Sequence, residues 1–332
     1  MTRTTVVVLG GGPSSEHDVS LASARSIASA LDVDRYDVDL LVIERDGSWR
    51  AHDETEPFAD GIAHAVRRLR AADVVIPALH GPGGEDGTIA GLLDVIGVPY
   101  VGSGVGAGAL AMDKVATKLV AAAHGVRTAS GVIAVDGELT DEAVAGLRFP
   151  VVVKPSAAGS SHGVSRVDAI DGLPAALTRA RRLDRTVLIE QFVTGREIDL
   201  AVVENPDGSL TVGPPLEVPR GAIGVFDAEA KYAGDVPFVI PAPVEAGLLR
   251  ELERAATTMF RALGCRGLAR VDFFVDEHGP LLNEVNTMPG FTASSQVPRM
   301  FAAVGLPYPQ LLDLLIDTAR SHRGQLAEGR AA

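Results

Sequence analysis

Residues 270–290, RVDFFVDEHGPLLNEVNTMPG, place charged side chains within two short apolar runs. The runs V-D-F-F-V and L-L-N-E-V-N are rich in β-branched and aromatic residues and flank the polar segment D-E-H-G, which predicts a β-hairpin. We expect its loop to span residues 276–280, so that Val275 faces Leu281. Because side chains alternate between the two faces of a strand, one face should carry a mixed set: Arg270, Asp272, Phe274, Leu282, Glu284 and Asn286.

This register places two carboxylates, Asp272 and Glu284, directly opposite each other, with Arg270 opposite Asn286. Like charges in that position repel and destabilise a sheet. A divalent cation between the two carboxylates replaces this repulsion with attraction. Carboxylates with an amide oxygen are hard ligands that suit Mg²⁺ together with substrate phosphates. The hairpin therefore predicts a magnesium site. The alternative is a solvated face with an Arg–Asp pair, which a register shifted by one residue would produce.

The composition limits the class of protein. The chain has 332 residues, enough for two or three domains, and its 46% hydrophobic and 22% charged residues are ordinary for a globular protein. No apolar run approaches the length of a membrane span, and the start, M-T-R-T-T-V-V-V-L-G-G-G, lacks the features of a signal peptide. The single cysteine, Cys265, excludes an internal disulfide and fits a reducing cytoplasm. We therefore expect a cytoplasmic protein without membrane association.

The net charge is −13, which argues against non-specific binding of nucleic acid, because such binding needs a basic surface. A substrate that carries phosphates would then depend on a few well-placed cations. The positions of lysine and arginine therefore matter for any phosphate site.

The first third of the chain alternates strands and helices. Apolar strands such as T-T-V-V-V-L and A-D-V-V-I-P-A-L are separated by helical segments, which predicts a doubly wound parallel sheet. Ligands of such sheets bind beyond the carboxyl ends of the strands, where the glycine-rich turns 10–12 and 81–87 fall. From Met112 onward the pattern is mixed, with a long loop at 219–235, a helix near 244–263 and a final amphipathic helix over 307–322.

Residues 154–163, K-P-S-A-A-G-S-S-H-G, lie between two predicted strands. Backbone N–H groups and serines of such a loop can form an anion nest, and Lys154 at the end of the preceding strand adds a point charge. Lys114 is a second candidate for phosphate binding. The alternatives are a plain surface hairpin for the loop and a solvated helix position for Lys114.

Two glycine patterns of nucleotide-binding proteins do not apply. The segment G-S-G-V-G-A at 102–107 matches a dinucleotide motif, but no acidic residue ends a second strand about 20 residues later, as that motif requires. We interpret it as a flexible helix entry. The P-loop sequence G-K-[ST] is absent from the chain.

Three other motifs carry weaker signals. Glu190 and Glu197 could accept hydrogen bonds from an adenine amino group and a ribose, or could belong to a charged linker. His80 ends a strand beside a glycine turn, where a functional and a structural role are equally compatible with the sequence. The segment E-A-K-Y at 229–232 could belong to a lid over a site, or could be ordinary loop polarity.

Together these motifs resemble the D-alanine–D-alanine ligase family of ATP-grasp enzymes over nearly the whole chain. In order, the matching segments are G-G-x-S-x-E-H-x-V-S-L, L-H-G-x-x-G-E-D-G, M-D-K, K-P…G-S-S-x-G, G-R-E, E-A-K-Y, R-V-D-F-F and N-E-V-N-T-x-P-G-F-T. The resemblance implies an ATP-grasp fold of mixed α/β and α+β character. It implies an N-terminal α/β domain over 1–111, a central subdomain over 112–195, a C-terminal subdomain over 196–325 and a tail over 326–332.

The resemblance also implies a reaction. ATP phosphorylates the carboxylate of a first D-alanine, and the amine of a second D-alanine attacks the acyl phosphate to form D-alanyl-D-alanine for peptidoglycan precursors. The implied cofactors are ATP and two Mg²⁺ ions, with Mn²⁺ as a substitute, and the implied assembly is a homodimer. Water must be kept from the acyl phosphate, which it would hydrolyse.

Site residues follow from the resemblance, position by position. The implied catalytic residues are Glu16, Ser160, Tyr232, Arg270 and Gly290. The implied substrate-binding residues are Glu16, His80, Arg270, Gly290, Ser295 and Gln296. The implied ATP-binding residues are Lys114, Lys154, Gly159, Ser160, Ser161, Glu190, Phe192, Val193, Glu197, Lys231, Asn283 and Glu284. The implied metal ligands are Asp272, Glu284 and Asn286, with Glu284 bridging the two ions.

Three positions depart from the family pattern: His162 in the phosphate loop, Ala228 in the lid, and Gln296 after Ser295. Because Gln296 should border the pocket of the second substrate, D-serine or D-lactate remains an alternative to the second D-alanine. A catalytically silent ATP-binding protein is disfavoured, because the charges at 270, 272, 284 and 286 would be costly to keep without a metal. A nicotinamide oxidoreductase is a more distant alternative.

Overall fold

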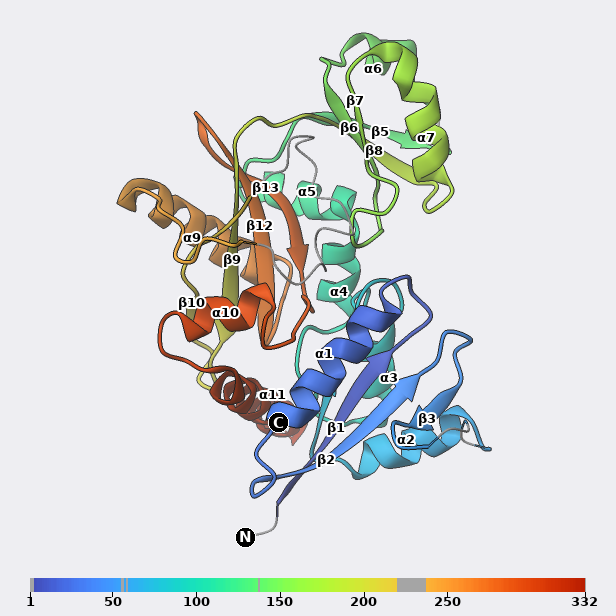
Figure 1. The fold of residues 1–332 in the computed structure, drawn as a ribbon, viewed down its shortest axis with the longest axis vertical. Helices are drawn as coiled ribbons and strands as arrows, with labels where there is room; N and C mark the ends of the chain where they lie inside the picture. The colour runs from blue at the N-terminus through green and yellow to red at the C-terminus, as the bar shows by residue number, and fades with distance from the viewer. Residues whose placement is uncertain (1–2, 55–56, 58, 137, 220–236, 332) are drawn as a thin grey trace.

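The computed structural model describes residues 3–54, 57, 59–136, 138–219 and 237–331. Three β-sheets follow one another along its longest axis (Figure 1). The first sheet lies at one end of that axis, the sheet of the middle of the chain lies at the other end, and the third sheet lies between them.

The first sheet has the strand order β3-β2-β1-β4. Strand β1 is parallel to β2 and β4, and only the edge strand β3 is antiparallel. Alternate residues of β1 enter different cores: Val6 and Val8 pack with α1, whereas Val7 and Leu9 pack with α2 and α3. Helices therefore cover both faces, which confirms the predicted doubly wound sheet. Its elements are β1 (Thr4–Gly11), α1 (His17–Ala30), β2 (Tyr36–Ile43), β3 (Trp49–Ala51), α2 (Ile62–Ala71), β4 (Val74–Pro77) and α3 (Thr88–Ile96).

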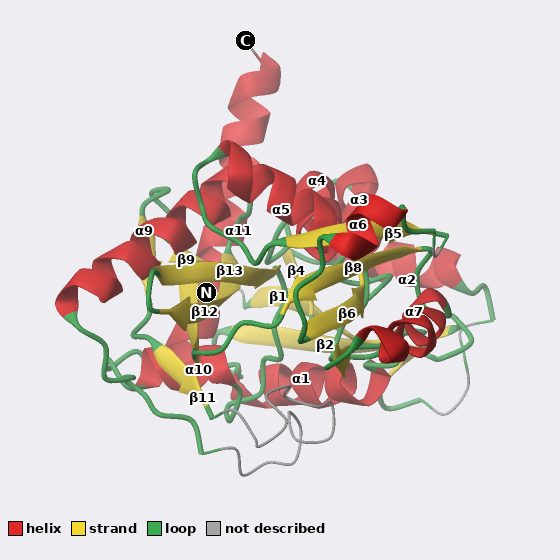
Figure 2. Cartoon of the chain, turned by 90° about the horizontal axis from the view of Figure 1, so that it is seen from above, coloured by secondary structure: helices red, strands yellow, loops and turns green. Residues whose placement is uncertain are grey.

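The second sheet is antiparallel, in the order β5-β8-β6-β7, and forms its own small core with α7. Figure 2 shows α6 and α7 beside this sheet. Its elements are β5 (Gly131–Val135), α6 (Asp141–Ala145), β6 (Val151–Pro155), β7 (Ser165–Val167), a 3₁₀ turn (Ile170–Gly172), α7 (Leu173–Arg181) and β8 (Thr186–Gln191).

The third sheet is antiparallel, in the order β10-β9-β12-β13, with β11 also paired to β9. Helices α4, α5 and α9 share a core with β9, β12 and β13. The elements are α4 (Val105–Met112), α5 (Lys114–Ala123), β9 (Arg196–Glu204), β10 (Leu210–Val212), β11 (Leu216–Val218), α9 (Ala246–Ala262), β12 (Leu268–Asp276), β13 (Gly279–Asn286), α10 (Gln296–Ala302) and α11 (Tyr308–Ala331). Helix α11 continues into the segment expected to be a tail at 326–332, and its end projects from the body of the molecule (Figure 2).

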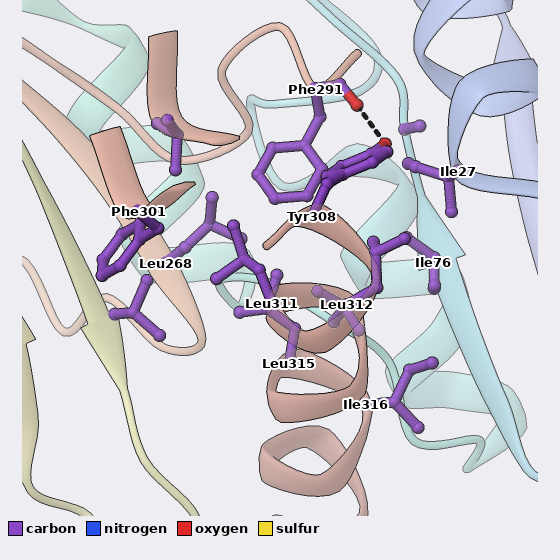
Figure 3. Packing of buried hydrophobic residues seen from close by; sticks show 14 of the residues in the cluster. Ile27, Ile76, Leu268, Phe291, Phe301, Tyr308, Leu311, Leu312, Leu315 and Ile316 are labelled. Atoms are coloured by element: carbon purple, nitrogen blue, oxygen red, sulfur yellow. Dashed lines mark hydrogen bonds between the residues drawn. The ribbon is translucent and has the colours of Figure 1, made fainter. Parts of the chain in front are cut away.

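Helix α11 joins the first and third sheets. Leu312 and Ile316 pack toward Ile76 of β4, and other side chains of the same helix meet Leu268 of β12 (Figure 3). The hydroxyl of Tyr308 donates a hydrogen bond of 2.5 Å to the carbonyl oxygen of Phe291. One hydrophobic cluster therefore fixes the first sheet against the loop that follows β13.

No helix in the described part of the chain combines the length and the apolar character needed to cross a membrane.

We predict that Leu312→Ala lowers the free energy of unfolding by about 2–5 kcal/mol, because it leaves a cavity between two sheets. Leu312 is 1% exposed. The matched control is Leu119→Ala on α5, whose side chain is 67% exposed and whose loss should cost no more than about 0.5 kcal/mol. Chemical denaturation of both variants measures the difference, and equal losses would contradict the role given to α11.

Candidate active site

Two adjoining cavities lie among the three sheets. The first is lined mainly by α1, the turn at 80–85 and the segment 284–299, and the second lies between β6, β8 and the β12–β13 hairpin. Four residues line both cavities: Lys114, Ala158, Glu197 and Glu284. The residues expected to bind amino acid and those expected to bind nucleotide thus meet at one junction.

The hairpin has the predicted carboxylate pair but a shorter turn. Asp272 pairs with Glu284, and Arg270 with Asn286, as expected. The register then shifts, so that Val275 pairs with Pro280, and the expected pairing of Val275 with Leu281 is wrong. The shift is a β-bulge, which places one extra residue on β13.

The bulge changes which side chains face the cavities. Leu282, expected beside Glu284, is instead buried with Phe273 in the core shared with α9. Asn283 and Glu284 are consecutive, yet both line the second cavity together with Phe274. Two successive polar residues on one face are possible only because the bulge interrupts the alternation.

A third carboxylate stands in the same row. Asp199 on β9 is the register partner of Asp272 on β12, so Asp199, Asp272 and Glu284 lie side by side on adjacent strands. Arg270 donates to both oxygens of Asp272, at 2.7 and 2.8 Å, and its Nε lies 3.9 Å from Asp199. Burial disfavours the guanidinium charge, but these carboxylates prevail and raise the pKa of Arg270 above its usual range. The sequence analysis did not identify Asp199.

The expected metal ligands all line the first cavity, and Glu284 also lines the second. Asn286 Nδ2 donates to Asp272 Oδ2 at 3.0 Å, and Lys114 Nζ lies 3.5 Å from Glu284 Oε2. Among the described residues, no three His, Cys, Asp or Glu side chains are arranged to hold a metal by themselves. Two carboxylates and an amide oxygen fit Mg²⁺, which usually takes its remaining ligands from water and phosphate.

The loop between β6 and β7 has the geometry of an anion site. Ser160 and Ser161 have φ values of 48° and 57°, a left-handed conformation that residues other than glycine adopt rarely. Such strain is found at functional sites, and left-handed residues allow successive N–H groups to form an anion-binding concavity. The loop and its flanking strands agree with the sequence prediction.

Lysine side chains gather at this site. The chain contains only four lysines, and the three described ones, Lys114, Lys118 and Lys154, all lie around the second cavity. Lys154 Nζ lies 2.5 Å from Glu190 Oε2 and 3.2 Å from Asn283 Oδ1. Lys118 donates to the other oxygen of Glu190 and to Ala129 O at 2.7 Å. Although burial favours the neutral acid, these two ammonium groups lower the pKa of Glu190.

Lys118 was not predicted from the sequence. The scarcity of lysine is the signal that could have found it, because cations elsewhere in this chain are almost all arginine.

The expected contact between Glu16 and Ser160 is present. Ser160 Oγ donates to Glu16 Oε1 across the first cavity. Two glycines allow this approach, since a Cβ atom at Gly81 or Gly159 would lie within 2.5 Å of Glu16 Oε2. Tyr232, the third member expected here, and Lys231, expected to bind ATP, lie outside the described residues.

The loop after β13 is held by side chains of the N-terminal part. His80 Nδ1 donates to Met288 O at 2.8 Å, which leaves Nε2 to accept from Ser23 Oγ at 2.9 Å. Met288 N donates to Glu85 Oε1 at 3.3 Å, and Phe291 N donates to Ser23 Oγ at 3.1 Å. Burial lowers the pKa of His80, so its imidazole is neutral at pH 7. His80 therefore positions the segment that contains Gly290.

The remaining expected residues also line the two cavities. Ser295 Oγ accepts from Thr292 N at 3.0 Å, and Gln296 Nε2 donates to Asp199 Oδ2 at 2.8 Å. All expected substrate residues line the first cavity: Glu16, His80, Arg270, Gly290, Ser295 and Gln296. All described ATP residues line the second cavity except Gly159 and Ser160, which line the first.

Two family profiles match this chain. A profile described as "D-ala D-ala ligase N-terminus" matches residues 5–103, and one described as "D-ala D-ala ligase C-terminus" matches residues 121–317. The chain belongs to the D-alanine–D-alanine ligase family. The D-alanine–D-alanine ligase of Mycolicibacterium smegmatis is 44% identical over 96% of this chain and 95% of its own length. The D-alanine–D-alanine ligase of Corynebacterium aurimucosum is 43% identical over 95% of this chain and 97% of its own length.

Solved structures of this ligase family share the fold. The D-alanine–D-alanine ligase from Coxiella burnetii superposes with a TM-score of 0.85 at 29% identity, covering 100% of this chain and 98% of its own. The VanG D-Ala:D-Ser ligase from Enterococcus faecalis superposes with a TM-score of 0.81 at 30% identity, covering 96% of this chain and 100% of its own. The Bacillus anthracis D-alanine–D-alanine ligase complexed with ATP superposes with a TM-score of 0.80 at 27% identity, covering 97% of this chain and 99% of its own. The expected ATP-grasp fold is confirmed.

We predict that Glu85 makes the stability of the protein depend on pH. Burial and the nearby Glu16 raise the pKa of Glu85 from 4.5 to about 8. The native state then holds a proton that the unfolded chain has lost, so the free energy of unfolding falls as pH rises toward 8. Burial lowers the pKa of His80 below its usual value, so its contribution has the opposite sign and fades as pH rises above 7.

Thermal melts across pH 7 to 8.5 test this. Glu85→Gln should flatten the decline in melting temperature, whereas the control Glu277→Gln, at a side chain that is 85% exposed, should leave it unchanged. Identical slopes for Glu85→Gln and the unaltered protein would refute the assignment.

Proposed function

We propose that this protein joins two D-alanine molecules into D-alanyl-D-alanine at the expense of ATP, through a D-alanyl phosphate, for peptidoglycan precursor synthesis. The observation that carries the proposal is the facing pair Asp272 and Glu284, of which Glu284 lines both cavities. On one side lie the lysines and the strained serine loop, and on the other lie Glu16 and Arg270. Phosphoryl transfer depends mostly on such positioning and on charge neutralisation.

The second cavity is assigned to ATP. Lys114, Lys154 and the loop at 159–161 would bind the phosphates, because they offer ammonium groups and backbone N–H groups in one place. Glu190 and Glu197 would bind the adenosine, and Phe192 and Val193 would contact its adenine base. Asn283 would bind ATP beside Lys154. The structural relative complexed with ATP supports the choice of nucleotide.

The ligands assigned to the metal are Asp272, Glu284 and Asn286, which would hold two Mg²⁺ ions with Glu284 between them. Mn²⁺ accepts the same oxygen ligands and could substitute. When bound, the ions would neutralise charge that develops on the transferred phosphoryl group. Lys114, beside Glu284, contributes positive charge at the same place.

The first cavity is assigned to the amino acids. Glu16 would bind the ammonium group of the first D-alanine, while Arg270 and the Gly290 N–H would stabilise the oxyanion that forms when the acyl phosphate is attacked. Ser295 would receive the carboxylate of the second D-alanine. His80 supports this site by holding Met288, two residues before Gly290.

Exclusion of water is assigned to the segment 219–235, in which Tyr232 would join Glu16 and Ser160, and Lys231 would reach ATP. This part of the proposal rests on the sequence, since 220–236 lie outside the described residues. We also propose that the protein acts in the cytoplasm, where its nucleotide is available, and that it forms a homodimer. The domain boundaries would lie near residues 111 and 195.

A second candidate differs only in the second substrate. Gln296 lines the first cavity, and one structural relative is a D-Ala:D-Ser ligase. Mass spectrometry of products from ATP, Mg²⁺, D-alanine, D-serine and D-lactate in competition decides between them. We expect D-alanyl-D-alanine as the main product at neutral pH, and a mainly mixed product would reject that choice.

We predict that Glu284→Gln lowers turnover by at least about a thousandfold while the fold persists, because the amide cannot bridge two cations. Steady-state rates and a thermal melt measure the two quantities. The control Glu277→Gln lies at the tip of the same hairpin and should retain full activity. A folded Glu284→Gln variant with most of its activity would remove the bridging role.

We predict that Lys154→Met weakens ATP binding by at least about tenfold and changes the apparent affinity for D-alanine much less. Methionine keeps the length of the side chain but removes the charge that a phosphate requires. Nucleotide titration measures the effect. The control for loss of a cation is Arg185→Met, at a side chain that is 72% exposed. Unchanged ATP affinity would leave Lys154 with a purely structural pairing to Glu190.

A further inference from the structure

A buried aspartate, Asp199, and a half-buried glutamine, Gln296, form a hydrogen-bonded pair at the wall of the first cavity. Asp199 lies on β9, is 1% exposed, and accepts a hydrogen bond of 2.8 Å from Gln296 Nε2. Gln296 is the first residue of α10 and directly follows Ser295. Both residues line the cavity that we assign to the amino acids.

The pair fixes the orientation of the glutamine amide. An ionised carboxylate only accepts hydrogen bonds, so the end of Gln296 that faces Asp199 must be the NH₂ group. The amide oxygen is then the end available to the cavity. The hydrogen bond from Nε2 to Asp199 is the only side-chain hydrogen bond that Gln296 makes within the described part of the chain. Gln296 therefore presents an acceptor, and Asp199 prevents the amide from turning over to present a donor.

The carboxylate also strengthens that acceptor. A hydrogen bond from the amide nitrogen to an anion polarises the amide and increases the partial negative charge on its oxygen. Hydrogen bonds between such an acceptor and a cationic donor are stronger than those to a neutral hydroxyl. The wall at Gln296 should therefore favour an ammonium group over an alcohol.

The pair lies close to the reacting centre. The Asp199 oxygen that binds Gln296 is also the one that lies 3.9 Å from Arg270 Nε. We place the reacting carboxyl group at Arg270 and Gly290, and the carboxylate of the second substrate at Ser295. The nucleophilic nitrogen of the second substrate must lie between these points, beside the residue that follows Ser295.

We propose that Gln296, held by Asp199, binds the α-ammonium group of the second substrate and thereby selects D-amino acids over D-hydroxy acids. The inference rests on the proposed function and adds a specificity-determining residue to it. Gln296 contacts the substrate, and Asp199 acts through Gln296 as a positioning residue. D-Alanine and D-serine both carry the recognised group, whereas D-lactate offers only a neutral hydroxyl.

A purely structural alternative is that the pair only ties α10 to β9. That alternative predicts that disrupting the pair harms reactions with amino acids and hydroxy acids equally. The two explanations therefore differ in the ratio of products and not in overall activity.

The test uses the full chain with ATP, Mg²⁺, D-alanine and an excess of D-lactate. Gln296→Met keeps side-chain length but removes the acceptor, and should raise the KM of the second D-alanine about tenfold with little change in the KM of ATP. The ratio of dipeptide to depsipeptide, measured by mass spectrometry, should fall by a similar factor. Asp199→Asn retains an acceptor without the charge, and should shift both quantities in the same direction by less.

Ala302→Gly is the control for a structural role. It loosens the exposed end of α10 without touching the pair, and should lower both products alike. An unchanged second-site KM in Gln296→Met, or an equal loss of both products, overturns the inference. Failure of the unaltered protein to form D-alanyl-D-alanine would instead overturn the proposed function, so the two failures are distinguishable.

Discussion

Repulsion among three carboxylates is the constraint around which this site is organised. Asp199, Asp272 and Glu284 stand side by side on adjacent strands. Two like charges about 5 Å apart repel by about 3 kcal/mol at an effective dielectric constant of about 20. Arg270 offsets part of this by binding Asp272 and approaching Asp199, and Lys114 approaches Glu284. Two cations against three anions leave a net negative charge, which a divalent ion with bound phosphates would neutralise.

The distribution of cations over the molecule follows from the same constraint. The chain carries a net charge of −13, so phosphate binding depends on local positive charge. Lysine, a compact point charge, is confined in the described residues to this site, whereas arginine supplies the ion pairs at the surface. Glu190 binds both Lys118 and Lys154, each through a different oxygen of its carboxylate, and so offsets the repulsion between the two ammonium groups.

The fold and the site differ in how much of each could be predicted from the sequence. Strand alternation suffices to place Asp272 opposite Glu284, since their pairing depends only on a local register. The bulge that turns Asn283 toward the cavity was not predictable, because it reflects packing of Leu282 and Phe273 against α9. Asp199 was missed because its importance comes from a strand neighbour far away in the sequence. A single acid within the apolar run I-D-L-A-V-V was its only local signal.

The oxyanion site depends on residues that belong to the opposite end of the chain. Both backbone polar groups of Met288 are bound by the N-terminal part, one by His80 and one by Glu85. Burial raises the pKa of Glu85, and Glu16, which we assign to the first substrate, raises it further and lies against Gly81 of the same turn. A positive group bound at Glu16 would reduce that repulsion and so stabilise the contact between Glu85 and Met288. Binding of the first amino acid would thereby strengthen the support of the loop that carries Gly290, before the second amino acid attacks.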